Sequence, residues 1–297
     1  MNRKSFGKLI ASLRQDLDWT QFQLSEYSGI DLAVISQIER GVKKQIQPEL
    51  LVRFANSFQL TTLERRELML AATGIDTAQI VRQRSAAIDT DSQDAARSLA
   101  QMMDLLGRLR IPAFLLDVYS DVLAANPSAF TFFQVPMDMV QSAASVPAGY
   151  NSVRLVFGKN LAQRTHFRTN WEAYAVESMR SFRELSLRYR AEPYFRYLIN
   201  AFRNPVEYPL FNRYWKIVSS TESDRNANYA RFVYDHDMFG HLEYAATTTT
   251  CLTAYGELML TQYFPTDERT AQAFAQILEQ SGSGAIRYAP WPDKPMP

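Results

Sequence analysis

Residues 20–41, TQFQLSEYSGIDLAVISQIERG, constrain the fold of this chain more than any other segment. Thr20 is a favourable N-cap, because its hydroxyl can accept a hydrogen bond from an unpaired backbone N–H of a first helical turn. Gly29 allows the backbone conformation of a tight turn, and Asp31 is a second N-cap. Apolar residues recur at helical spacing on both sides of the turn, at Leu24, Val34, Ile35 and Ile38. The segment predicts two short helices joined by a tight turn, the second ending at Gly41.

A helix held against a partner in this way can lie in the major groove of DNA and present its first residues to base edges. The segment resembles the repressor-like helix-turn-helix proteins of the XRE family. Gln21 matches the glutamine that opens the first motif helix of that family, and residues 35–41, ISQIERG, match the end of its recognition helix. The resemblance implies that Arg14 and Glu39 form an ion pair that ties the first helix to the recognition helix. The alternative is two helices of an ordinary bundle.

The chain departs from that family at two base-reading positions. Leu32 and Ala33 stand where polar residues are usual, and they can touch a thymine methyl but cannot make bidentate hydrogen bonds. Base reading then shifts to DNA shape or to three other residues, Gln21, Ser36 and Gln37. Basic residues at and after the end of the recognition helix suit phosphates, which position a protein without specifying sequence: Arg40, Lys43 and Lys44.

Charge and cysteine content limit the environment and the partners. Residues 1–73 contain ten Lys and Arg against eight Asp and Glu, a net charge of +2. This weak excess predicts modest non-specific DNA affinity, which a homodimer would raise. The lone Cys251 excludes an intramolecular disulfide and fits a reducing cytosol. No stretch approaches the roughly 20 apolar residues of a membrane span, so we expect a cytoplasmic protein without a membrane partner.

The 297 residues have room for two domains. Helical periodicity and caps predict an all-α, five-helix domain over residues 1–73, and residues 74–100 predict a linker and a connecting helix. Residues 101–283 predict an α+β domain with two strands, a helical insert, three strands and a final helix. That order is expected of a PAS-like domain with a five-stranded antiparallel sheet and helices over one face. Residues 284–297 predict a loop-like tail.

The second half resembles the ligand-binding domain of the MmyB-like transcription regulators. The resemblance rests on collinear segments such as LLGRLRIPAFLLDVYSDVLAANPSAFTFF, NWEAYAVESMRSFR and FNRYW. Asn126, Trp171 and Trp215 match its characteristic positions, whereas Ala125 and Ser219 stand where that family commonly has tryptophan and histidine. Together the two resemblances imply a ligand-responsive DNA-binding transcription regulator that is not an enzyme.

The helical insert is rich in aromatic residues, which predict either a packed core or an apolar ligand cavity. Period-two alternation places one set on a sheet face: Phe114, Leu116, Phe232, Tyr234, Leu258 and Leu260. A helix layer opposite would carry Trp171, Tyr174 and Phe182, and Asn126, Phe130 and Trp215 complete the candidate site. Most arginines of the insert should form a solvated face, but Arg180 and Arg188 are candidates to hold a carboxylate. A long-chain fatty acid is the expected effector, with no cofactor required.

Other functional classes have less support in the sequence. Residues 235–237, DHD, with His241 lie at a predicted turn, where surface hydrogen bonding is the expected role, so no metal site is predicted. No G-x-S-x-G, Walker or Rossmann pattern is present. Two alternatives stay open for the second half: a protein-interaction module without a small ligand, and a haem or flavin sensor.

Overall fold

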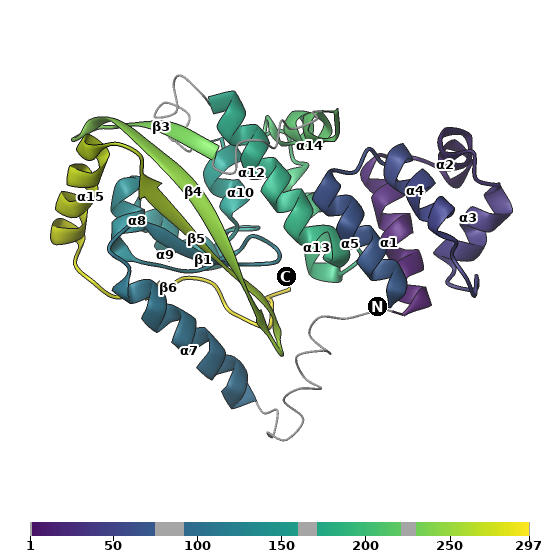
Figure 1. The fold of residues 1–297 in the computed structure, drawn as a ribbon, viewed down its shortest axis with the longest axis horizontal. Helices are drawn as coiled ribbons and strands as arrows, with labels where there is room; N and C mark the ends of the chain where they lie inside the picture. The colour runs from purple at the N-terminus through teal and green to yellow at the C-terminus, as the bar shows by residue number, and fades with distance from the viewer. Residues whose placement is uncertain (1, 75–91, 160–170, 221–229, 297) are drawn as a thin grey trace.

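A computed structural model describes residues 2–74, 92–159, 171–220 and 230–296 (Figure 1). Helices from the first quarter of the chain form one part, and a curved antiparallel sheet with its covering helices forms the other. Helices α12 (Trp171–Ser186) and α13 (Pro193–Phe202) lie between the sheet and the N-terminal helices. This arrangement confirms a multidomain chain with a helical N-terminal part and an α+β part.

The five predicted N-terminal helices are present, with the predicted caps. Thr20 and Thr61 each form a capping box with the residue three positions later, and Asp31 accepts from the backbone N–H groups of Ala33 and Val34. Gly29 ends its helix in the left-handed conformation at φ +61°. A single apolar cluster joins the helices, which are α1 (Arg3–Asp16), α2 (Gln21–Ser28), α3 (Leu32–Glu39), α4 (Pro48–Ser57) and α5 (Thr62–Thr73).

The sheet of the C-terminal part has six strands in the described residues, all pairing antiparallel. Their spatial order is β3-β4-β5-β1-β2-β6. The bounds are β1 (Ala113–Asp117), β2 (Val122–Ala125), β3 (Ala230–His236), β4 (Gly240–Thr253), β5 (Gly256–Pro265) and β6 (Ile286–Arg287). The predicted α+β class is confirmed, while the likeness to a PAS-like domain stays a prediction.

Helices cover both faces of the sheet. One face packs on α8 (Pro127–Phe132) and α15 (Glu268–Ser281), with the start of α12 beside them. The opposite face packs on α7 (Ser92–Arg108). The prediction of helices over a single face is therefore wrong. The predicted connecting helix is α7, and it packs on the sheet. The remaining helices are α9 (Met137–Gln141), η1 (Ala143–Ser145), α10 (Ser152–Phe157), η2 (Leu187–Tyr189) and α14 (Phe211–Ser220).

The tail predicted as a loop over residues 284–297 instead packs against the sheet. Its first residues form β6, which pairs with Ala124 and Ala125 of β2, so the sheet has six strands where five were predicted. Lys294 then forms ion pairs with the buried carboxylates Asp117 and Asp121. These contacts could not be predicted from the sequence. A two-residue strand is too short to show periodicity, and a lysine in a polar tail is usually exposed to solvent. The predicted linker over residues 75–91 lies outside the described residues.

Candidate functional site

Close backbone packing fixes the orientation of the recognition helix α3. A Cβ atom on Gly7 of α1 would lie 2.3 Å from the carbonyl oxygen of Ile38, so only glycine lets α1 approach the end of α3 this closely. Gly41 ends α3 at φ +72°, and a Cβ there would lie 2.7 Å from the Cα of Lys4. Helix α1 therefore holds α3 in place and brings Lys4 beside the basic segment that follows α3.

The ion pair between Arg14 and Glu39 is present and bidentate. Arg14 Nε donates to Glu39 Oε1 at 2.8 Å and Nη2 donates to Oε2 at 3.0 Å, with side chains 13% and 7% exposed. Arg14 Nη1 also donates to the carbonyl oxygen of Trp19. Gln21 Nε2 donates to Glu39 Oε2 at 2.7 Å. The Gln21 amide is thus held by Glu39 at the start of α2, so it can contact DNA only in this fixed orientation.

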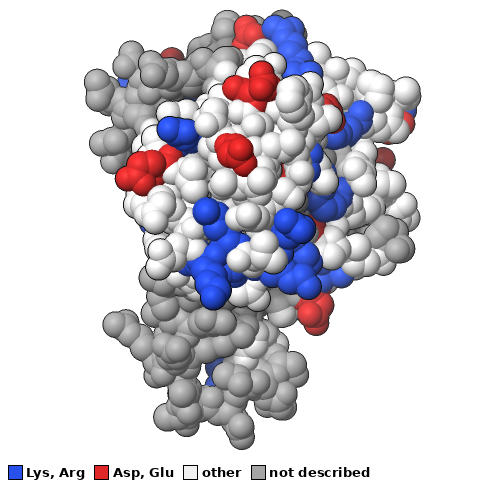
Figure 2. Space-filling view, turned by 90° about the vertical axis from the view of Figure 1, so that its right-hand side faces the viewer, with Lys and Arg blue, Asp and Glu red and all other residues white. Residues whose placement is uncertain are grey.

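The other predicted DNA contacts lie along one exposed stretch. Leu32, Ala33 and Gln37 are exposed on α3, and Ser36 is half-buried between them. Arg40 and Lys44 are exposed just beyond the helix, with Lys43 half-buried. Figure 2 views the molecule from the end that carries α2 and α3, and a group of Lys and Arg side chains lies together on the lower part of this face. The geometry leaves Gln37 accessible to base edges and the basic residues accessible to phosphates.

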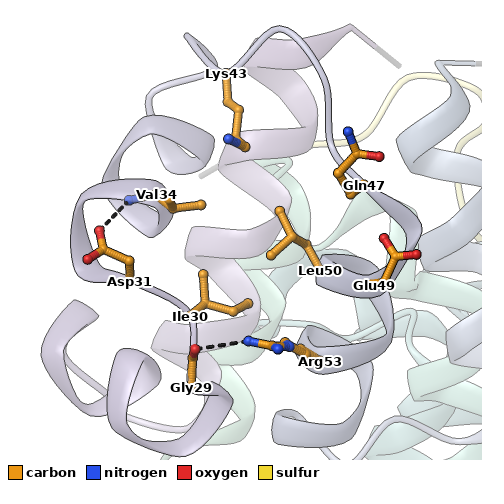
Figure 3. Close-up of a pocket in the computed structure, with 9 residues that line it drawn as sticks. All are labelled: Gly29, Ile30, Asp31, Val34, Lys43, Gln47, Glu49, Leu50 and Arg53. Carbon is orange, nitrogen blue, oxygen red and sulfur yellow. Dashed lines mark hydrogen bonds between the residues drawn. The ribbon is translucent and has the colours of Figure 1, made fainter.

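A surface pocket of about 410 Å³ lies beside the start of α3 (Figure 3). Lys43 extends into it from one side, and Arg53 closes it from α4 by donating to the carbonyl oxygen of Gly29 at 3.0 Å. Asp31 and Glu49 add acidic groups to the wall. The pocket places two cations at the edge of the DNA-binding surface, and Arg53 was missed by sequence reasoning because α4 lies outside the motif.

The candidate ligand face is the aromatic side of the sheet. Phe114, Phe232 and Tyr234 are buried there, as predicted, with Phe130 of α8 against them and Leu116, Trp171 and Tyr174 half-buried beside them. Tyr174 meets Phe232 edge-on at 5.4 Å between ring centroids. Sequence reasoning missed Tyr244, which is fully buried on the same face and whose Oη has no hydrogen-bond partner among the described residues.

Two groups of predicted ligand residues lie elsewhere. Leu258 and Leu260 of β5 point to the opposite face, where they pack with α7; Met259, Thr261 and Tyr263 take the alternate positions of the strand. Phe182 and Trp215 belong to the packed core between α12, α13 and α14. The assignment of Leu258 and Leu260 was wrong because β5 is apolar on both sides, so alternation does not identify its face.

The polar candidates are engaged in other contacts. Arg188 pairs with Glu67 and Glu257, and Arg180 with Glu177. Asn126 Oδ1 accepts from the backbone N–H groups of Ala113 and Ala129, and its Nδ2 donates to Ile111. Asn126 therefore caps α8, and the two arginines are already neutralised by carboxylates. On the ligand face, the hydroxyl of Tyr244 is a buried polar group without a hydrogen-bond partner among the described residues.

Comparison with family models decides the identity of the chain. Residues 96–277 match the MmyB-like transcription regulator ligand binding domain, and residues 10–65 match a helix-turn-helix family model. The chain belongs to the MmyB-like transcription regulators. No curated protein matches it. These two matches support a ligand-responsive DNA-binding transcription regulator, and the families are those of regulators rather than enzymes. Within the described ranges, no helix of this MmyB-like regulator is long and apolar enough to cross a membrane.

The helix-turn-helix part of the regulator is joined to the ligand-binding part by buried ion pairs that sequence reasoning missed. Glu64 of α5 is fully buried and contacts both Arg183 and Arg190. Asp16, at the end of α1, contacts Arg190 at 3.9 Å and Arg196 at 2.6 Å. The expectation of a solvated arginine face is therefore wrong for Arg183 and Arg190, which are 3% and 2% exposed. The sequence did contain one signal for these pairs. Asp16 lies at the C-terminus of α1, where an acidic side chain is unfavourable unless a cation is near.

Burial and charge oppose each other at these carboxylates. Burial alone would raise the pKa of Glu64, but the guanidinium groups of Arg183 and Arg190 outweigh it and leave the pKa below its usual value. At Asp16, burial dominates over the opposing charges of Arg190 and Arg196, and the pKa is raised. Glu64 is therefore the firmly ionised anchor of the contact between the two parts.

Proposed function

We propose that the effector of this regulator is an elongated apolar molecule with one acidic or polar end, such as a long-chain fatty acid. The proposed site lies between the aromatic face of the sheet and the start of α12. Trp171 and Tyr174 of α12 are half-buried against that face. Entry of an acyl chain requires these side chains to shift, because they pack on the sheet in the structure.

The observation that carries this proposal is the hydroxyl of Tyr244, which is buried among aromatic side chains and has no hydrogen-bond partner in the described part of the chain. A buried polar group without a partner is destabilising, and a ligand oxygen would satisfy it. Burial raises the pKa of Tyr174 to about 12 and that of Tyr244 well above its usual value. Both hydroxyls therefore stay protonated at neutral pH, and that of Tyr244 can donate to a carboxylate. An acyl chain of about twelve methylenes would gain up to about 0.8 kcal/mol each, before ordering costs.

Mass spectrometry of a lipid extract from the purified protein tests this proposal, followed by thermal unfolding of delipidated protein with added myristate. We expect a co-purified acyl chain and a melting temperature that rises with myristate concentration. Tyr244→Phe removes only the hydroxyl and should weaken myristate binding. Tyr150→Phe is the matched control, because Tyr150 packs on the opposite face of the sheet. An empty extract together with an unchanged melting temperature would contradict the acyl effector and favour a protein-interaction module.

We also propose that a cytoplasmic homodimer holds the operator, with Gln21, Ser36 and Gln37 reading bases and Arg40, Lys43 and Lys44 on phosphates. Apolar Leu32 and Ala33 at the start of α3 leave one copy with few base contacts. A two-fold dimer doubles those contacts and requires half-sites about 34–36 Å apart, or a multiple of that distance. Sedimentation with a footprint on a selected operator tests this, and a monomer protecting one half-site would contradict it.

A further inference from the structure

Neither DNA binding nor the proposed ligand explains the buried contacts at the junction between the two parts of the chain. Glu64 receives the fork of Arg183, with Nε to Oε1 and Nη2 to Oε2 both at 3.1 Å, and Arg190 Nη2 at 2.5 Å. Leu187 of η2 is fully buried within the apolar cluster of the N-terminal helices. Thr61 adds a hydrogen bond to Glu184. The end of α12 and the turn after it are therefore embedded in the DNA-binding part.

The junction is polar and incompletely satisfied. Asp16 Oδ2 and Arg190 Nε are buried without a hydrogen-bond partner among the described residues. Arg190 also carries a pKa lowered by burial, despite the opposing charges of Glu64 and Asp16. Buried charges of this kind lose little when both surfaces become hydrated together, because desolvation offsets much of their attraction. Such a junction suits an equilibrium between a docked and a separated arrangement of the two parts.

Helix α12 links this junction to the proposed ligand face. Tyr174 packs on Phe232 of the sheet, and Arg183 lies nine residues further along the same helix. At 100° and 1.5 Å per residue, the two side chains leave opposite sides of the helix about 13.5 Å apart along its axis. A displacement of the α12 backbone at Tyr174 would therefore reach Arg183 at the other end of the same helix.

A second path of packed groups runs beside the helix. Trp215 of α14 stacks on Phe211, and its carbonyl oxygen accepts from Arg183 Nη1 at 2.9 Å. The guanidinium groups of Arg183 and Arg190 lie 5.2 and 5.1 Å from the Trp215 ring. Phe211 contacts Phe157, which contacts Trp171 at the start of α12. Both ends of α12 are thus tied through rings to the arginines that hold Glu64.

We propose that α12 couples the ligand face to the DNA-binding domain, with Arg183 and Arg190 on Glu64 as the releasable contact. This inference rests on the proposed effector. Occupancy of the sheet face displaces Trp171 and Tyr174, shifts α12 and weakens the contact with Glu64, so the effector favours the separated arrangement. Because an effector shifts an equilibrium only by its differential affinity for the two states, operator DNA and effector must affect each other's affinity equally.

The test uses the full chain in a Cys251→Ser background with spin labels at Glu26→Cys and Glu279→Cys, both exposed positions in different parts. Glu64→Gln removes the charge while keeping the Thr61 capping box, since glutamine also fits that motif. Arg196→Gln, at a side chain 27% exposed, gives a milder variant if the first does not fold. The matched control is Glu172→Gln, which breaks an exposed pair of α12 with Arg213.

We expect one narrow distance distribution in delipidated wild-type protein, and a broader or displaced one after adding myristate. Glu64→Gln should show the displaced distribution without myristate, Arg196→Gln an intermediate one, and Glu172→Gln the wild-type response. In the same samples, we compare the operator dissociation constant with myristate to that without it. The ratio of the two should fall to about 1 in Glu64→Gln. If myristate raises the melting temperature but distances and operator response match wild type in every variant, the coupling is wrong and the proposed effector survives. Failure of wild-type protein to bind myristate overturns both.

Discussion

Glu64 and Arg183 stand 119 positions apart in the sequence and form a bidentate ion pair in which neither side chain is more than 3% exposed. Such a pair has little net value compared with apolar packing, but breaking it leaves an uncompensated buried charge. Loss of Glu64 would also remove a carboxylate partner of Arg190. In the docked arrangement, removing Glu64 alone therefore leaves both arginines without this carboxylate.

Glu64→Ala should lower the free energy of unfolding by about 3–5 kcal/mol, because it leaves two buried guanidinium groups and removes one of the two hydrogen bonds of the Thr61 capping box. Urea unfolding of the full chain measures this loss. The control Glu172→Ala removes an exposed pair and should cost no more than about 1 kcal/mol. Equal unfolding midpoints for the two variants would refute the importance of the buried contact.

Arg14→Ala should destabilise the N-terminal helices by about 3 kcal/mol, near the low end for a broken buried pair, since the arginine retains some solvent contact. Glu39 would lose its main partner and would then be held by Gln21 alone. Arg108→Ala is the control, because its pair with Asp104 is exposed. A melting temperature equal to that of wild type would show that the Arg14 pair contributes nothing.

Lys294→Met should destabilise the chain more at pH 8 than at pH 5. Burial raises the pKa of Asp117 to about 6, although Lys294 opposes the rise. This carboxyl is therefore ionised at pH 8, where it needs the ammonium, and mostly protonated at pH 5, where it does not. Removing Lys294 would raise the pKa of Asp117 further, so the loss of stability at pH 8 would exceed the loss at pH 5 by more.

Thermal unfolding of Lys294→Met and wild-type protein at both pH values measures this effect. We expect the free energy of unfolding to fall by about 3–5 kcal/mol at pH 8. Lys159→Met is the control, because its pair with Glu207 is largely exposed. Equal losses at pH 5 and pH 8 would mean that Lys294 does not neutralise the buried carboxylates.

DNA contacts should separate into two classes. Gln37→Ala should reduce the preference for operator over random DNA by about 1–3 kcal/mol, since Gln37 is exposed on α3. Lys43→Ala with Lys44→Ala should weaken binding to both DNAs and flatten its salt dependence by about 0.9 per lost phosphate contact. Anisotropy titrations at several salt concentrations measure both. Loss of Gln37 that weakens both DNAs equally would remove it from base reading.

Features that depend on near neighbours could be predicted from the sequence. Thr20, Asp31 and Thr61 each begin a helix where their side chains can cap it, and Gly29 ends one in the left-handed region. These signals placed the helix-turn-helix correctly. The same holds for the order of the strands, with two before the helical insert and three between it and the final helix.

Features that depend on distant partners could not be predicted. Both sides of β5 carry buried residues, so the sequence around Leu258 is compatible with either orientation. Arg183 and Arg190 lie in an arginine-rich insert that predicts a solvated face, and their burial depends on distant partners such as Glu64 and Asp16. A partner more than 100 positions away leaves no pattern in the sequence around either residue, so the pairing cannot be predicted from that sequence.

The most direct test of the account compares operator binding by delipidated protein and by the same protein loaded with myristate. The operator is first selected from random duplexes, and anisotropy titrations give both dissociation constants. Regulation by an effector in the C-terminal domain predicts constants that differ by about tenfold or more, which corresponds to about 1.4 kcal/mol of coupling. Identical constants, in samples where mass spectrometry shows myristate bound, would contradict the claim that this ligand controls DNA binding.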